Sequence, residues 1–127
     1  MLLGSTRALK VWAWPAPIDL RRGFDGLYGL VEQQLRKEPL SGDLFLFTNR
    51  ARTGCKILLW DGTGLCIFQK RLTQGRFANL FTTAGNPVSV SLTASELNLF
   101  IEGAAQVVAV SPREIRPQNL IAKVPRI

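Results

Sequence analysis

Histidine is absent from this chain of 127 residues, and cysteine occurs only twice. Without histidine the chain lacks the usual general base, the commonest metal ligand and every Ser-His or Cys-His catalytic arrangement. Two cysteines, Cys55 and Cys66, do not make a disulfide framework, and the strand pairing expected below does not place them opposite one another. We therefore expect buried, reduced thiols in a cytoplasmic protein.

Long apolar runs are also missing, since no stretch of about 18 apolar residues occurs. The first ten residues lack the apolar segment and cleavage site of a secretory signal. Acidic residues are few: nine Asp and Glu against sixteen Lys and Arg give a formal charge of +7. Such a balance favours nucleic acid as a partner over an anionic membrane, while a basic surface kept only for solubility is the plain alternative.

The apolar content of 46% is ordinary for a globular protein. Residue patterns predict an α+β fold, with a mostly antiparallel sheet of about five or six strands, a main helix near residues 24–37 and a shorter helix near 94–102. One domain is expected over residues 1–110, followed by a basic, proline-containing tail at 111–127. The expected strands cover residues 10–14, 43–48, 55–60, 65–72, 87–92 and 106–110.

Each expected helix has its own signal. Thr93 and Glu96 have the spacing of a capping box at the start of the shorter helix. The main helix has one apolar stripe at helical spacing. That stripe consists of Phe24, Leu27, Tyr28, Val31 and Leu35.

A β-hairpin is expected around the turn Asp61-Gly62-Thr63-Gly64. If Trp60 pairs with Leu65, then Lys56 pairs with Gln69. Both hairpin faces are then apolar near the turn and charged at the far end. This pattern predicts a sheet partly covered on each side, by the main helix and by another strand layer or a second subunit.

Basic residues gather on this hairpin and its flanking loops. Asp61 is the only acidic residue between Arg50 and Arg76. Cations on a rigid sheet suit a polyanion, so we expect these residues to contact phosphates, with a solvated charged face as the alternative. The six basic residues are Arg50, Arg52, Lys56, Lys70, Arg71 and Arg76.

Two further groups are candidates for nucleic-acid contact. Arg21 and Arg22 precede a helix start and form a second basic patch, unless nearby carboxylates pair with them. Trp60 is expected either to stack on a base or to pack in the core. The same two alternatives apply to Trp12 and Trp14, which point to one side of their strand.

The sequence gives little support for a catalytic site or a metal site. Four carboxylates, those of Asp19, Asp25, Asp43 and Asp61, could in principle hold Mg²⁺, but their places at helix ends and turns explain them sufficiently. Neither glycine-rich nucleotide-binding motif is present. We therefore expect no enzyme activity, no metal and no cofactor. A metal-dependent nuclease using Asp19, Asp25 and Asp61 is the weakest alternative.

Several runs, taken together, carry a family resemblance that covers residues 10–103. They resemble the motifs of the TnpB-type (Orf2-like) accessory proteins of the sixty-six family of bacterial insertion sequences. The matching runs are DLRRGFDGL (19–27), Phe47-x-Asn49-Arg50, KILLWDGTG (56–64), KRLTQGRF (70–77) and the leucine-rich segment 97–103.

This resemblance implies a non-catalytic accessory protein for DNA transposition, encoded beside a separate transposase that cuts and joins DNA. The expected partners are that transposase and double-stranded DNA, read with weak sequence preference because phosphate contacts carry no sequence information. RNA, single-stranded DNA and a homo-oligomer stay open. The competing hypothesis is a protein–protein adaptor that docks on the transposase without touching DNA.

Overall fold

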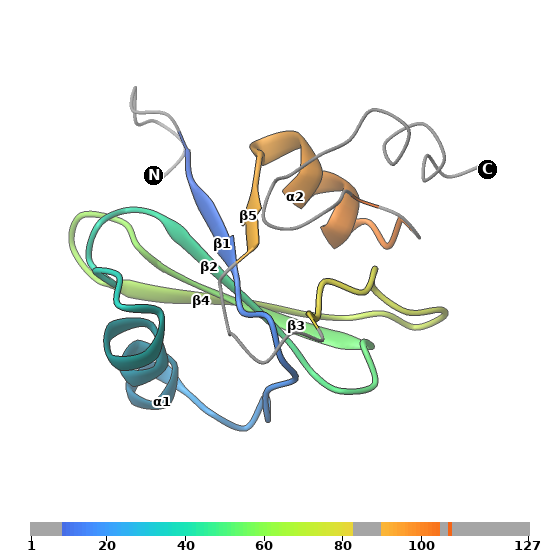
Figure 1. The fold of residues 1–127 in the computed structure, drawn as a ribbon, viewed down its shortest axis with the longest axis horizontal. Helices are drawn as coiled ribbons and strands as arrows, with labels where there is room; N and C mark the ends of the chain where they lie inside the picture. Colours follow the sequence, from blue (N-terminus) through green and yellow to red (C-terminus); the bar gives the residue numbers. More distant parts are fainter. Residues whose placement is uncertain (1–8, 83–89, 105–106, 108–127) are drawn as a thin grey trace.

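The computed structural model describes residues 9–82, 90–104 and 107. Its strands form one sheet in the order β4-β3-β2-β1-β5, and helices lie on both sides of it (Figure 1). This arrangement confirms the predicted α+β fold. The elements are β1 (Val11–Ala13), α1 (Phe24–Gly29), the π-helical segment η2 (Leu30–Leu35), β2 (Leu44–Thr48), β3 (Gly54–Trp60), β4 (Leu65–Arg71), β5 (Val90–Leu92) and α2 (Ala94–Ile101).

The sheet is mostly antiparallel, as predicted. Three strand pairs, β1–β5, β2–β3 and β3–β4, are antiparallel. The exception is β1–β2, which is parallel and joined through α1 and η2. Parallel neighbours need such a long crossover, so this connection places the main helix against one face of the sheet.

Each face of the sheet has its own apolar core. Leu27 and Val31 from the helix pack on one face with Phe45 and Leu58 of the strands. The opposite face is covered by α2 and by the segment that contains Phe77. The sequence had suggested another strand layer or a second subunit as the second cover. The structure shows α2 and the Phe77 segment in that place. The central strands β2 and β3 are apolar on both faces because both faces are buried.

The main helix differs from its prediction. It ends at Leu35 rather than residue 37, and Arg36 adopts a left-handed backbone conformation with φ 57°. The Lys37 N–H then donates to the Val31 carbonyl at 3.1 Å, which closes the helix end. Pro39 follows two residues later. It has no N–H and restricts the backbone of Glu38, so it opposes any continuation of the helix.

The apolar stripe also needs a correction. Phe24 is 48% exposed, whereas Leu30, which the predicted stripe omitted, is buried. The two tryptophans of the first strand segment, Trp12 and Trp14, both pack against the α1 side of the core. Core packing therefore accounts for both rings, and Trp14 lies 6.2 Å from Phe47 between ring centroids.

Most other boundaries agree with expectation to within two residues. The shorter helix is capped as predicted: the Glu96 N–H donates to Thr93 Oγ1 and the Thr93 N–H donates to Glu96 Oε1. Of the strand expected at 87–92, the described part is Val90–Leu92. The strand expected at 106–110, the tail at 111–127 and the domain boundary between them lie outside the described residues, so they stay predictions.

Candidate nucleic-acid interface

The β3–β4 hairpin carries most of the predicted contact residues. Its register runs from Trp60 opposite Leu65 to Gly54 opposite Arg71, which confirms the predicted pairing. Asp61 Oδ1 closes the turn by accepting the N–H groups of Thr63 and Gly64, at 2.9 and 3.0 Å. The hairpin therefore has a turn end at Trp60 and an open end at Gly54 and Arg71.

The two hairpin lysines point to opposite faces of the sheet, as the predicted register places them. Lys56 is 8% exposed on the α1 side, and its Nζ donates to the Arg22 carbonyl at 2.8 Å. Lys70 lies opposite Cys55 and faces α2, where its Nζ donates to the Ile101 carbonyl at 2.8 Å. Both ammonium groups hold backbone segments against the sheet, a role that the residue pattern alone did not reveal.

Arg52 is also engaged inside the protein. Its backbone is left-handed, with φ 59°, a conformation that costs a non-glycine residue about 1 kcal/mol or more. Contacts with Phe77 hold it there: the Arg52 carbonyl accepts the Phe77 N–H at 2.6 Å, and its guanidinium donates to the Phe77 carbonyl at 3.1 Å. Arg52 thus fastens the loop before β3 to the segment after β4.

Three exposed arginines surround the open end of the hairpin. Arg50 lies in the loop between β2 and β3, and Arg71 is the last residue of β4. Arg76 immediately precedes Phe77, which Arg52 ties to the same loop. The Leu72 N–H donates to the Thr53 carbonyl at 2.8 Å, so the two loops lie side by side.

The second predicted patch reaches the same end of the molecule. Lys56, two residues from Gly54, binds the Arg22 carbonyl, and Leu20 lies against Gly54. The segment before α1 therefore joins the hairpin's open end. We call the resulting group of exposed guanidinium groups the basic end; it consists of Arg21, Arg22, Arg50, Arg71 and Arg76.

Within residues 9–82, 90–104 and 107, Arg21 is the one member of the basic end with a recognised carboxylate partner. Its side chain is 91% exposed and forms an ion pair with Asp19, with 2.7 Å between Nη2 and Oδ2. Hydrogen bonds from the Arg21 side chain and backbone lower the pKa of Asp19 to about 2. Asp19 therefore stays charged, and Arg21 stays paired, throughout the neutral pH range.

Trp60 is separated from the basic end. It is the last residue of β3 and lies beside the turn, six residues along the strand from Gly54. At about 3.4 Å per residue this places it roughly 20 Å from the open end. The sequence grouped Trp60 with the arginines because they are close along the chain, but the structure does not bring them together.

The carboxylates do not form a metal site. Asp19 is occupied by Arg21, Asp61 closes the hairpin turn, and Asp43 Oδ2 accepts the Trp12 Nε1–H at 3.0 Å. Within residues 9–82, 90–104 and 107, no group of three His, Cys, Asp or Glu side chains could hold a metal ion. The nuclease alternative that needs Asp19, Asp25 and Asp61 together gains no support from this geometry.

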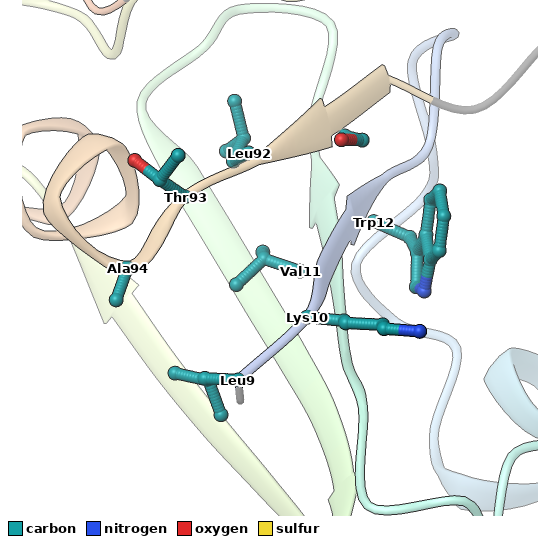
Figure 2. A pocket seen from close by; sticks show the side chains of 8 residues that line it. Leu9, Lys10, Val11, Trp12, Leu92, Thr93 and Ala94 are labelled. Atoms are coloured by element: carbon teal, nitrogen blue, oxygen red, sulfur yellow. The ribbon is translucent and has the colours of Figure 1, made fainter. Parts of the chain in front are cut away.

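An open hollow of about 340 Å³ lies between the start of β1 and the end of β5 (Figure 2). Its lining is mostly apolar, with Lys10, Ser91 and Thr93 as its polar residues. The hydroxyl of Thr93 already accepts the Glu96 N–H, and the Lys10 side chain extends toward Trp12, away from Leu9 and Ala94. The lining offers no convergent polar groups, so this hollow has no evident chemistry.

Sequence reasoning missed the residue that shapes the loop bearing Arg50. Asn49 Oδ1 accepts the N–H groups of Thr53 and Gly54, at 2.9 and 3.0 Å, and fixes the entry into β3. Asn is common in such loops because its side chain bonds to nearby backbone groups. That propensity, together with Gly54 at the start of the strand, was the available signal.

Both cysteines are free thiols. Cys55 is buried as expected, and desolvation raises its pKa to about 11. Cys66 is only partly buried, contrary to expectation, because it lies on the outermost strand β4. Partial desolvation and the nearby Asp61 carboxylate raise its pKa as well, so neither thiol is activated as a nucleophile.

Comparison with known proteins places the chain among mobile-element proteins. Residues 9–109 match the family model described as IS66 Orf2 like protein. The uncharacterized protein y4hO of Sinorhizobium fredii is 32% identical over 102 residues, which cover 80% of this chain and 86% of that protein. The uncharacterized protein y4jC of the same organism is 34% identical over 76 residues, covering 60% and 65% respectively. No solved structure matches the chain. In the described part, no helix has the length and apolarity to cross a membrane.

Proposed function

Because the chain belongs to the IS66 Orf2-like family, which functions in insertion-sequence transposition, we propose that it is a non-catalytic accessory protein that binds DNA through its basic end. The transposase encoded by the same element is its expected protein partner. The proposal extends the family assignment to a mode of action.

The placement of exposed guanidinium groups carries this proposal. Arg22, Arg50, Arg71 and Arg76 are exposed residues of three chain segments whose backbones adjoin the open end of the hairpin. Guanidinium groups suit phosphate because their planar donors can bind two oxygens at once. Arg52, Lys56 and Lys70 hold the supporting backbone in place. Contacts to phosphates alone position a protein without reading bases, so we expect weak sequence preference.

A fluorescence titration of the protein with labelled duplex DNA, single-stranded DNA and RNA, at several salt concentrations, tests the proposal. If the four arginines of the basic end other than Arg21 contact phosphates, the logarithm of the duplex association constant should fall with the logarithm of salt at a slope of about −3.6. A slope near zero, or no binding to any of the three at low salt, would contradict DNA binding by this protein.

Freeing Arg21 should strengthen binding. Asp19→Asn preserves the side-chain oxygen that accepts the Arg21 N–H but removes the charge that holds the guanidinium. We expect the duplex affinity to rise by up to about eightfold near 0.1 M salt, because one further phosphate contact becomes available. Asp25→Asn, which removes an equal charge from the start of α1, is the matched control. Equal gains in the two variants would show that Arg21 makes no contact of its own.

The adaptor hypothesis is the second candidate function. Exposed arginines can also pair with an acidic protein surface, so the basic end is compatible with docking on a transposase. The apolar character of both hairpin faces favours docking less than the sequence suggested, because the β3 part of each face is buried within the protein and only β4 stays partly exposed. A complex with the transposase that survives nuclease treatment, together with no measurable DNA binding, would favour the adaptor.

A further inference from the structure

Strand β4 forms one edge of the sheet and lies outermost next to β3. Its seven residues pair with β3, and no other pairing partner occurs among the described residues. Six of the seven β3 residues are buried, whereas every β4 residue is partly or largely exposed. An edge strand of this length presents a row of free backbone donors and acceptors that can pair with another strand.

Apolar side chains occupy the half of β4 that lies next to the turn. Leu65 and Ile67 lie on the α1 side, where they only partly join the core, and Phe68 lies on the α2 side with 43% of its surface exposed. No proline or charge interrupts this half, although both are common devices against edge-to-edge pairing. The charged residues of β4, Lys70 and Arg71, lie only in the other half, at the open end of the hairpin.

The charge distribution along the edge identifies a suitable occupant. Asp61 precedes β4 at the turn end, and Arg71 ends β4 at the open end. A second copy in antiparallel orientation brings the acidic turn of each chain toward the cationic half of the other. A parallel copy would instead place like charges opposite each other, which is unfavourable.

We propose that two copies of this chain pair antiparallel along β4 and join their sheets into one. A two-fold axis through Ile67 places Cys66 opposite Phe68 of the second copy and Leu65 opposite Gln69 of the second copy. Lys70 and Arg71 of each chain then lie beside the uncharged turn residues Gly64 and Thr63 of the other, so the cationic halves of the two strands stay apart. Such an interface is self-complementary, as a two-fold dimer requires. It does not depend on DNA binding, and it would give the assembly two basic ends.

Phe68→Lys tests the interface at its centre. Phe68 and Leu99 are equally exposed, at 43% and 44%, but Leu99 lies on α2 and not on the edge. Sedimentation velocity from low micromolar to submillimolar concentration should show a reversible dimer for the unaltered protein and for Leu99→Lys. In Phe68→Lys the dissociation constant should rise more than about tenfold, since lysines from both chains then meet near the axis. Circular dichroism confirms that each variant is folded.

Several results would overturn this proposal. One is an unaltered protein that stays monomeric across the whole concentration range. Another is a dimer that Leu99→Lys weakens as much as Phe68→Lys does, which would place the interface elsewhere. Hydrogen exchange provides an independent measurement: protection of the β4 amides should rise with protein concentration. Protection that is equally high in a monomer would mean that other parts of the same chain cover this edge.

Discussion

The double variant Arg50→Ala/Arg71→Ala should bind duplex DNA about 60-fold more weakly than the unaltered protein near 0.1 M salt. Each arginine that contacts a phosphate releases counterions and contributes about 0.9 to the slope of the logarithm of the association constant against the logarithm of salt. The slope should therefore decrease in magnitude by about 1.8. Both side chains are exposed, and no hydrogen bond or ion pair of either is recorded within the described structure, so the fold should tolerate the change.

The matched control is Lys10→Ala/Arg36→Asn, which removes the same net charge. Lys10 precedes β1, whose register with β2 and β3 places it toward the turn end of the hairpin. Arg36 follows η2 and has a left-handed backbone, a conformation that Asn tolerates better than Ala. We expect this control to lower the affinity only slightly, through the loss of long-range attraction.

A fluorescence titration at three or more salt concentrations separates the two explanations. If the two double variants lose equal affinity and share one slope, net charge rather than the basic end determines binding. If neither variant changes the slope while the unaltered protein binds strongly, phosphate contacts lie elsewhere in the chain. Either outcome would remove the basic end from the mechanism and leave the family assignment intact.

The sequence predicted the hairpin well because its signals are local. The turn residues around Asp61 and the alternation of β3 and β4 determine the pairing, and the observed register agrees at every position that was predicted. The capping box at Thr93 is equally local. Short motifs also identified the family, and two of them, KILLWDGTG (56–64) and KRLTQGRF (70–77), include residues of the hairpin strands.

The hydrogen-bond partners of the cationic side chains could not be predicted from such local signals. Lys70 reaches the carbonyl of Ile101, 31 residues later in the chain, and Lys56 reaches that of Arg22, 34 residues earlier. Such partners depend on how helices and strands pack, which alternation within a strand does not determine. The sequence therefore named the basic residues correctly but grouped exposed arginines with lysines that serve the fold.

The helix end was missed for a similar reason. The sequence placed the helix end near residue 37, yet the backbone reverses at Arg36 and the preceding segment is π-helical. Leu30, the first residue of that segment, is buried, whereas Phe24 in the first turn of α1 stays exposed. Neither feature has a distinctive residue pattern.

Phe77→Ala should reduce the free energy of unfolding by about 3–5 kcal/mol, the largest stability loss we expect from a single substitution here. Phe77 is fully buried and stacks on Phe100, with ring centroids 4.7 Å apart and 8° between the planes. Removing the ring leaves a cavity between α2 and the sheet and abolishes this aromatic pair. Urea denaturation followed by circular dichroism measures the loss.

Phe24→Ala is the control, because the same side chain at a 48% exposed position should cost much less. Similar losses in the two variants would contradict the assigned core. The comparison also explains why adjacent residues of one motif differ in role: Arg76 is exposed, while Phe77 is buried and its backbone binds Arg52. Under conditions where Phe77→Ala stays folded, duplex affinity should fall by less than in the double arginine variant, since the exposed guanidinium groups are retained. A larger fall would show that the Arg52–Phe77 contact positions the basic end as well as stabilising the fold.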